Sequence, residues 1–155
     1  MKTSTAFKNL LQIRKNTIVQ LEKHSDNVTI IPDGFSNSLI WNAAHCVVTL
    51  QLLAYKLSGL EMHISDELAD MYKKGTKAST EKNTDINELK NLLTSTVSQL
   101  KNDYEKGIFN DYSPYKTSFG ITLNSIEEVI SFNNIHESLH LGYMMAMSKN
   151  IQRRN

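Results

Sequence analysis

The scarcity of glycine and proline is the feature that most limits what this chain can fold into. Only six glycines and two prolines occur in 155 residues. An all-β fold of this length needs many tight turns, and these two residue types supply much of the backbone geometry that such turns require. The composition therefore predicts an all-α fold in which a few long helices are joined by loops.

Apolar residues at three- and four-residue spacing predict four amphipathic helices. Ser36 or Asn37 is the expected N-cap of the second helix, and the stretch from Ser125 to Glu128 resembles the capping box of the fourth. The predicted helices cover residues 4–24, 37–58, 85–106 and 125–151.

Four helices of this length favour a four-helix bundle, since each would be roughly 30 Å long. The connections between the second and third helices and between the third and fourth are long for such a bundle. Long loops in a small domain usually carry short structure of their own or functional groups. We expect one domain over residues 1–155, with any site beside these loops.

The charge balance argues against several classes of partner. Seventeen basic and sixteen acidic residues leave a net charge of +1, which provides no basic field for nucleic acid or an anionic membrane. The sequence also lacks a signal peptide and an apolar run long enough to cross a membrane. The single cysteine, Cys46, fits a reducing compartment and is expected to be a small buried thiol. We therefore expect a cytoplasmic protein.

Residues 136–140 spell H-E-x-x-H, the zinc-binding motif of many metalloproteases. The remainder of the chain does not fit a protease. One protease class needs a glycine and a histidine farther along, where this chain has Tyr143 and Ala146. Another class takes its third ligand from a later helix, yet no Glu, Asp or His follows His140. We therefore do not expect an HExxH protease.

The two histidines of the motif still predict a metal site. His136 and His140 share the apolar face of the last predicted helix, so both rings should point into the bundle. His45 lies on the apolar face of the second helix and is the expected third ligand. Three neutral imidazoles leave a coordination position open, as in catalytic sites. Imidazole suits a divalent ion such as zinc or nickel.

The residues around the predicted ligands are expected to support them or to surround the site. Asn133 is expected to support the ligands from one turn away, and Trp41 and Tyr143 are expected to be core residues or walls of the pocket. Glu137 lies about 100° around the helix from His136. A salt bridge or an indirect contact with the site suits it better than the role of general base, although it stays a weak catalytic candidate.

The loop after residue 72 contains three lysines close together. Lys73, Lys74 and Lys77 are expected to be solvated, with binding of an anionic substrate group as the alternative reading.

The segments LIWNAAHCVVTLQLLAYKLSGL (39–60) and SIEEVISFNNIHESLHLGYMMAMSK (125–149) resemble the DinB-like superfamily of small bacterial metal-binding four-helix bundles. In that family a W-x-x-x-H segment and an H-x-x-x-H pair hold a divalent metal, and the matching positions here are Trp41, His45, His136 and His140. Characterised relatives include transferases that use bacillithiol or mycothiol. The resemblance also implies a homodimer.

These observations lead to two functional hypotheses. The first is a metal-dependent transferase of the thiol S-transferase type, or a hydrolase, in which thiolate or water attacks a small-molecule substrate at the three-histidine site. The alternative is a non-catalytic, stress-associated metal-binding protein with a structural or interaction role.

Overall fold

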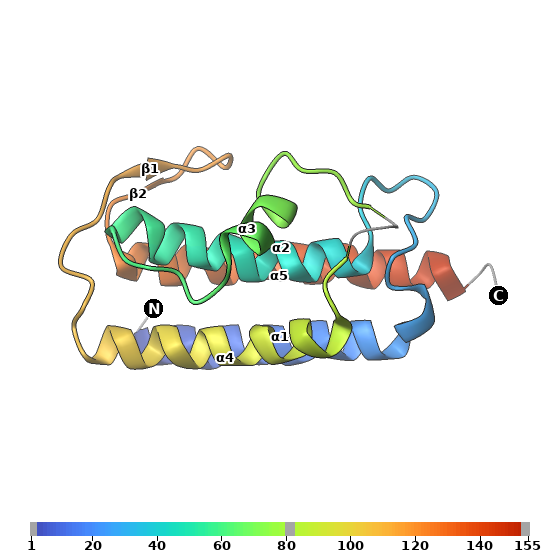
Figure 1. Cartoon of the computed structure of the whole chain (residues 1–155), viewed down its shortest axis with the longest axis horizontal. Helices are drawn as coiled ribbons and strands as arrows, with labels where there is room; N and C mark the ends of the chain where they lie inside the picture. The colour runs from blue at the N-terminus through green and yellow to red at the C-terminus, as the bar shows by residue number, and fades with distance from the viewer. Residues whose placement is uncertain (1–2, 80–82, 153–155) are drawn as a thin grey trace.

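The chain folds as a bundle of four long helices (Figure 1). The computed structural model describes residues 3–79 and 83–152. The predicted all-α fold is confirmed, and each predicted helix is found within a few residues of its expected bounds. The long helices are α1 (Thr3–Lys23), α2 (Leu39–Ala54), α4 (Ile86–Glu105) and α5 (Ile126–Gln152).

The four helices form two layers. Helices α1 and α4 lie side by side in one layer and α2 and α5 in the other (Figure 1). Between the layers, α1 packs on α5 and α2 packs on α4. Every long helix therefore contacts one helix of its own layer and one of the other layer. The contact between α2 and α5 brings together the two segments that carry the predicted metal ligands.

Both long connections carry short structure. The short helix α3 (Asp66–Tyr72) packs on α2 within the first connection. The second connection contains a hairpin of two short antiparallel strands, β1 (Tyr115–Lys116) and β2 (Thr122–Leu123). Figure 1 shows both lying over the α2 and α5 layer. Single turns of 3-10 helix occupy Ser25–Asn27 and Lys56–Ser58.

Side-chain caps define where the helices begin. The N-cap of α2 is Ser38, whose hydroxyl accepts a hydrogen bond from the backbone of Trp41, so the predicted cap at Ser36 or Asn37 is wrong by one or two residues. Asp85 caps α4 in the same way. At the start of α5, Ser125 accepts a hydrogen bond from the backbone of Glu128 at 3.4 Å, as the predicted capping box requires.

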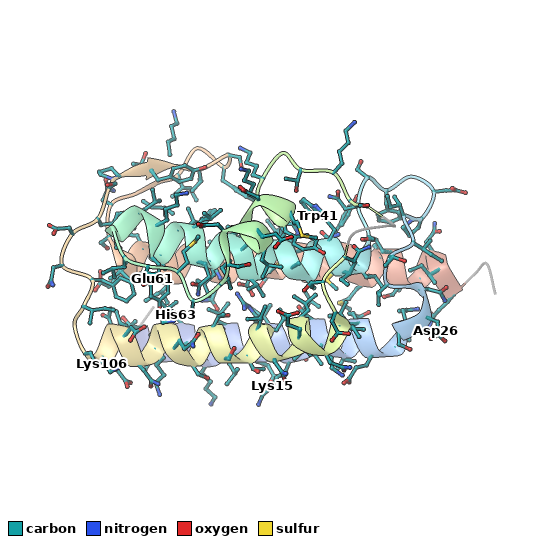
Figure 2. All side chains as sticks on the ribbon, viewed as in Figure 1. Lys15, Asp26, Trp41, Glu61, His63 and Lys106 are labelled. Carbon is teal, nitrogen blue, oxygen red and sulfur yellow. The ribbon has the colours of Figure 1, made fainter. Side chains whose placement is uncertain are left out.

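Helix α2 is buried on nearly every side because α4, α5 and α3 all pack against it. Its sequence, LIWNAAHCVVTLQLLA, contains no Asp, Glu, Lys or Arg. By contrast, Lys15, Asp26 and Lys106 lie on the outside of the bundle (Figure 2). None of the described helices is both long enough and apolar enough to cross a lipid bilayer.

Arg14 of α1 departs from this pattern, because its side chain is fully buried in the bundle. Its guanidinium forms a bidentate pair with the carboxylate of Glu137, with both N–O distances at 2.7 Å. It also donates to the carbonyls of Leu93 and Cys46 and to the hydroxyl of Thr96. These five bonds match the five N–H donors of arginine, and their partners lie on α2, α4 and α5.

We expect the variant Glu137→Leu to lower the free energy of unfolding by about 3–5 kcal/mol, because it leaves the buried Arg14 without its counter-charge. The double variant that also carries Arg14→Leu should recover much of that loss. Urea denaturation measures both effects.

The matched control for this prediction is Lys90→Ala, which removes a partly exposed pair with Glu22. It should change the free energy of unfolding by no more than about 1 kcal/mol. A loss of the same small size for Glu137→Leu would contradict the assigned role of the buried pair.

Candidate metal centre

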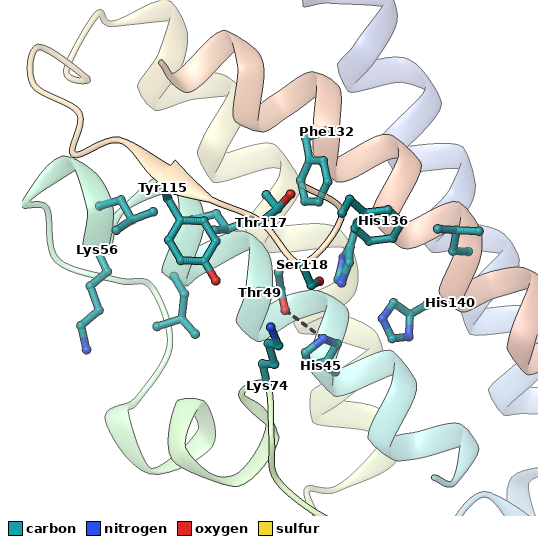
Figure 3. Close-up of a pocket in the computed structure, with 15 residues that line it drawn as sticks. His45, Thr49, Lys56, Lys74, Tyr115, Thr117, Ser118, Phe132, His136 and His140 are labelled. Atoms are coloured by element: carbon teal, nitrogen blue, oxygen red, sulfur yellow. Dashed lines mark hydrogen bonds between the residues drawn. The ribbon is translucent and has the colours of Figure 1, made fainter. Parts of the chain in front are cut away.

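Three histidines from α2 and α5 meet between the two helices (Figure 3). His45 lies near the middle of α2, and His136 and His140 lie one turn apart on α5. Each ring has a nitrogen within 4.8 Å of a nitrogen of the other two. The ring of His45 lies 5.4 Å from that of His136 and 4.9 Å from that of His140, measured between centroids. The structure therefore brings together all three predicted ligands.

Hydrogen bonds to oxygen acceptors orient two of the rings. His45 Nδ1 lies 2.7 Å from the carbonyl oxygen of Tyr72, and His140 Nδ1 lies 2.8 Å from Oδ1 of Asn42. The amide nitrogen of Asn42 donates to the carbonyl of Ser38, which directs Oδ1 toward His140. A carbonyl oxygen can only accept, so Nδ1 carries the proton in both rings. Their Nε2 lone pairs remain for a ligand.

Aromatic packing and a hydroxyl hold the rings further. Trp41 stacks on His45 with the ring centroids 4.7 Å apart and the planes at 9°. In the absence of an ion, the Thr49 hydroxyl, 3.2 Å from Nε2 of His45, donates to the lone pair of that nitrogen, so a metal ion bound there would replace this hydrogen bond. Phe132 stacks on His136 at 6.1 Å. Trp41 is therefore a core residue, as the first of its two expected roles requires, and it supports a ligand without forming part of the pocket wall.

The three imidazoles are neutral near pH 7. Burial lowers the pKa of His45 below its usual value. Burial, together with the neighbouring charges of His140, His45 and Arg14, lowers the pKa of His136 to about 3. Burial, and repulsion from the positive charge that His45 carries when it is protonated, lower the pKa of His140 to about 4. Neutral imidazole is the form that binds metal, so no proton has to leave before an ion can bind.

A cavity of about 450 Å³ opens beside the histidines, between α2, α5 and the β1–β2 hairpin (Figure 3). All three rings line it. Most of its other walls are apolar or aromatic, and within residues 3–79 and 83–152 neither a carboxylate nor a thiol contributes to them. The apolar and aromatic lining residues are Leu52, Leu53, Leu57, Tyr115, Phe119, Phe132 and Leu139, and the polar ones are Thr49, Lys56, Lys74, Thr117 and Ser118.

Glu137 and Asn133 face the core of the bundle and not this cavity. Glu137 is 1% exposed, and its carboxylate is bonded to Arg14 and to the side-chain amide of Asn133, at 2.6 Å. The salt bridge expected as the better reading of Glu137 is confirmed. Its weaker candidacy as a general base has no geometric support, because the carboxylate is saturated by donors. Asn133 supports Glu137 and forms no hydrogen bond to a histidine.

Tyr143 does not line the cavity beside the histidines. Its side chain is 38% exposed and packs edge-on against Phe35, with ring centroids 5.0 Å apart. It lines a separate, smaller hollow together with Asn42 and His140. Tyr143 is thus the wall of a neighbouring hollow, while the main cavity is bounded by residues from α2 and the hairpin.

The supporting residues Asn42, Thr49 and Tyr72 were not predicted. Asn42 is a buried polar residue in a helix without charges, which is a signal that the sequence does contain. Thr49 is another polar residue of this uncharged helix, and it lies one helical turn after His45. Tyr72 contributes its backbone carbonyl, and a contact of this kind cannot be predicted from the pattern of side chains in the sequence.

The residues present fit a divalent metal ion. Zinc binds imidazole nitrogen at about 2.0–2.1 Å, so two nitrogens on one ion lie at most about 4.2 Å apart. Small ring rotations would bring the three nitrogens from their present separations to that range. Nδ1 of His136 is buried and lacks a hydrogen-bond partner within the described residues. No fourth protein group in residues 3–79 and 83–152 joins the cluster, which leaves a coordination position for another molecule.

The chain matches a known protein family. The sequence model of a protein family described as the DinB superfamily matches residues 10–144, which include all three histidines. No curated protein matches the chain.

We expect the stability of the metal-free protein to fall as the pH drops from about 6.5, the pKa of histidine in an unfolded chain, toward about 4. In that range the unfolded chain binds protons that the folded His136 and His140 exclude, so protonation favours unfolding. The slope should reach about 1.4 kcal/mol per pH unit for each histidine. Urea denaturation between pH 7.5 and 4.5 measures it.

The double variant His136→Ala/His140→Ala is the control, because it retains every other titrating group. Its stability should depend less steeply on pH in the same range. Equal slopes for the two proteins, or ring signals of His140 that titrate near pH 6.5 in NMR spectra, would contradict the assignment.

Proposed function

The chain belongs to the DinB superfamily, and from that membership and its histidine cluster we propose that it binds one divalent metal ion, zinc or nickel, through His45, His136 and His140. We further propose that it transfers a low-molecular-weight thiol to a small electrophilic substrate. The observation that carries the proposal is the convergence of three neutral imidazoles, without a fourth protein ligand, on one wall of an apolar cavity.

A bound divalent ion would lower the pKa of a thiol and so supply a thiolate nucleophile at neutral pH. The residues of the chain prepare the site for that chemistry. Tyr72 and Asn42 hold two imidazoles in the tautomer that presents Nε2. The apolar walls lower the local dielectric, which would strengthen the attraction between a bound ion and a thiolate.

In the transfer, the thiol sulfur forms a bond to an electrophilic carbon of the second substrate. The bond from that carbon to its leaving group breaks, and the leaving group departs with the electron pair. The thiol proton passes to solvent. The step therefore needs no oxidant or reductant, and it needs no further acid or base from the protein if the leaving group is stable as an anion.

The cavity favours a thiol over water as the nucleophile. Hydrolysis by water is usually assisted by a general base, and the carboxylate next to the ligands in the sequence, Glu137, is engaged with Arg14. A free thiol has a pKa near 8.5, whereas that of water is about 15.7. A bound zinc ion would bring water to a pKa near 7 as well, so the preference for a thiol rests on the smaller shift that a thiol needs and on the engagement of Glu137 with Arg14.

Elemental analysis tests the metal site. We expect the wild type to bind one equivalent of zinc or nickel, and His45→Ala, His136→Ala and His140→Ala each to lower the affinity by more than about 100-fold, since even an indirect ligand partner is worth 10–100-fold. His63→Ala is the matched control, because His63 pairs with Asp103 away from the cluster. Unchanged metal content in the three ligand variants would refute the site.

Turnover tests the activity. With bacillithiol and monochlorobimane as probes, the metal-loaded wild type should form the thioether at least tenfold faster than the uncatalysed background. Chelator or His140→Ala should abolish the excess rate, and His63→Ala should retain it. A protein that binds metal and loses thermal stability with chelator, but shows no thiol-dependent turnover, would instead fit the alternative of a metal-binding structural protein.

A further inference from the structure

The cavity beside the histidines carries more positive charge than the chain as a whole. The sequence has 17 Lys and Arg residues against 16 Asp and Glu. Among the described residues, the cavity is nevertheless lined by Lys56 and Lys74 and by no carboxylate. A divalent ion on the histidines would add to this positive charge. The charged ligand that such a cavity favours is therefore an anion.

Lys74 belongs to the loop that also orients His45. Helix α3 ends at Tyr72, and the carbonyl of that residue accepts the hydrogen bond from His45 Nδ1 at 2.7 Å. Lys74 follows two residues later. The position of this lysine relative to the histidines is thus tied to a contact of the site itself.

A tight turn then fixes the direction in which Lys74 leaves the loop. Gly75 has a φ of +90°, a backbone conformation that favours glycine, and the backbone N–H of Thr76 donates to the carbonyl of Lys73 at 3.2 Å. The Thr76 hydroxyl accepts a hydrogen bond from Nε1 of Trp41, at 3.2 Å. Trp41 stacks on His45, so the far side of the turn is anchored to the site as well.

The neighbouring lysines are placed differently. Figure 3 shows Lys74 reaching toward Thr49 and His45, while Lys56 lies farther from the histidines, past Tyr115. Lys73 forms an ion pair with Asp70 at 2.7 Å and does not line the cavity. Lys74 has no ion-pair partner in the part of the chain that the structure describes, so its ammonium group is available to a ligand.

The opposite wall offers aromatic surface. Phe119, from the turn of the hairpin, packs edge-on against Phe132 of α5, with ring centroids 5.7 Å apart. Phe119 lines the cavity and is 50% exposed, so much of its ring is free to contact a ligand. Together with Leu52 and Leu57 it forms an apolar surface that an apolar ligand group would cover.

We propose that this cavity selects an amphipathic anion as the substrate that receives the thiol. Its apolar body, about the size of an aromatic ring, packs on Phe119 and Phe132, and its carboxylate, sulfonate or phosphate group is held by Lys74. The proposal rests on the proposed function, because it names the substrate class of the same site. Lys74 is a residue that determines specificity and takes no part in bond making.

Calorimetric titration of the metal-loaded protein tests this proposal with 4-phenylbutane-1-sulfonate and the neutral 4-phenylbutan-1-ol. The sulfonate is a weak metal ligand, so its preference reports on the lysine and not on the ion. We expect the wild type to bind the sulfonate about tenfold more tightly than the alcohol, as a charge-assisted hydrogen bond provides. Lys74→Gln should remove this preference.

Lys73→Gln is the matched control, since it removes the adjacent positive charge, which does not line the cavity, and should retain the preference. Raising the ionic strength should reduce the preference in the wild type. Equal affinities for the two probes in the wild type, or a preference that survives Lys74→Gln, would overturn the proposal. An equal loss of the sulfonate preference in Lys74→Gln and Lys73→Gln would also overturn the proposal. It would show that the preference comes from the overall positive charge of the loop and not from a contact with Lys74.

Elemental analysis of the same samples separates this proposal from the proposed function. A wild type that holds its metal but shows no sulfonate preference refutes the substrate class alone. A wild type that binds no zinc or nickel refutes the proposed function, independently of the titrations.

Discussion

The ion pair between Arg14 and Glu137 is the interaction on which the arrangement of the bundle depends. Burying a charge in an apolar core is costly unless each of its polar atoms has a partner. Arg14 meets that condition only when α2, α4 and α5 all present their acceptors at the same point. A shift of any one helix along its axis would leave a donor unsatisfied. The pair therefore favours one register of the four helices over others, and the same register brings His45 opposite His136 and His140.

Helix α5 divides its residues between two tasks. His136 and Glu137 are adjacent, yet the first lines the cavity and the second reaches into the core, because consecutive residues of a helix point about 100° apart. The letters of a protease motif are thus shared between a cluster of neutral imidazoles and a structural ion pair. This separation explains how the chain can contain H-E-x-x-H while its glutamate is saturated by an arginine and an amide.

Features that depend on local spacing could be predicted from the sequence. The four long helices and the convergence of His45, His136 and His140 follow from apolar periodicity, and the structure contains both. Arg14 was not singled out, because a basic residue in an amphipathic helix normally reaches solvent, and its partner lies 123 positions away. The hairpin and the carbonyl of Tyr72 depend on packing that no local pattern encodes. The three lysines after α3 looked alike in the sequence, and the structure separates Lys74, which lines the cavity, from Lys73, which pairs with Asp70.

The loop from Tyr72 to Thr76 touches the histidine site at one end through a carbonyl, at the other through Trp41, and carries Lys74 between them. Two binding events that draw on one short segment are thermodynamically linked, so each alters the affinity of the other by the same factor. If the proposed ion and the proposed anion both bind, the shared loop would couple their two affinities.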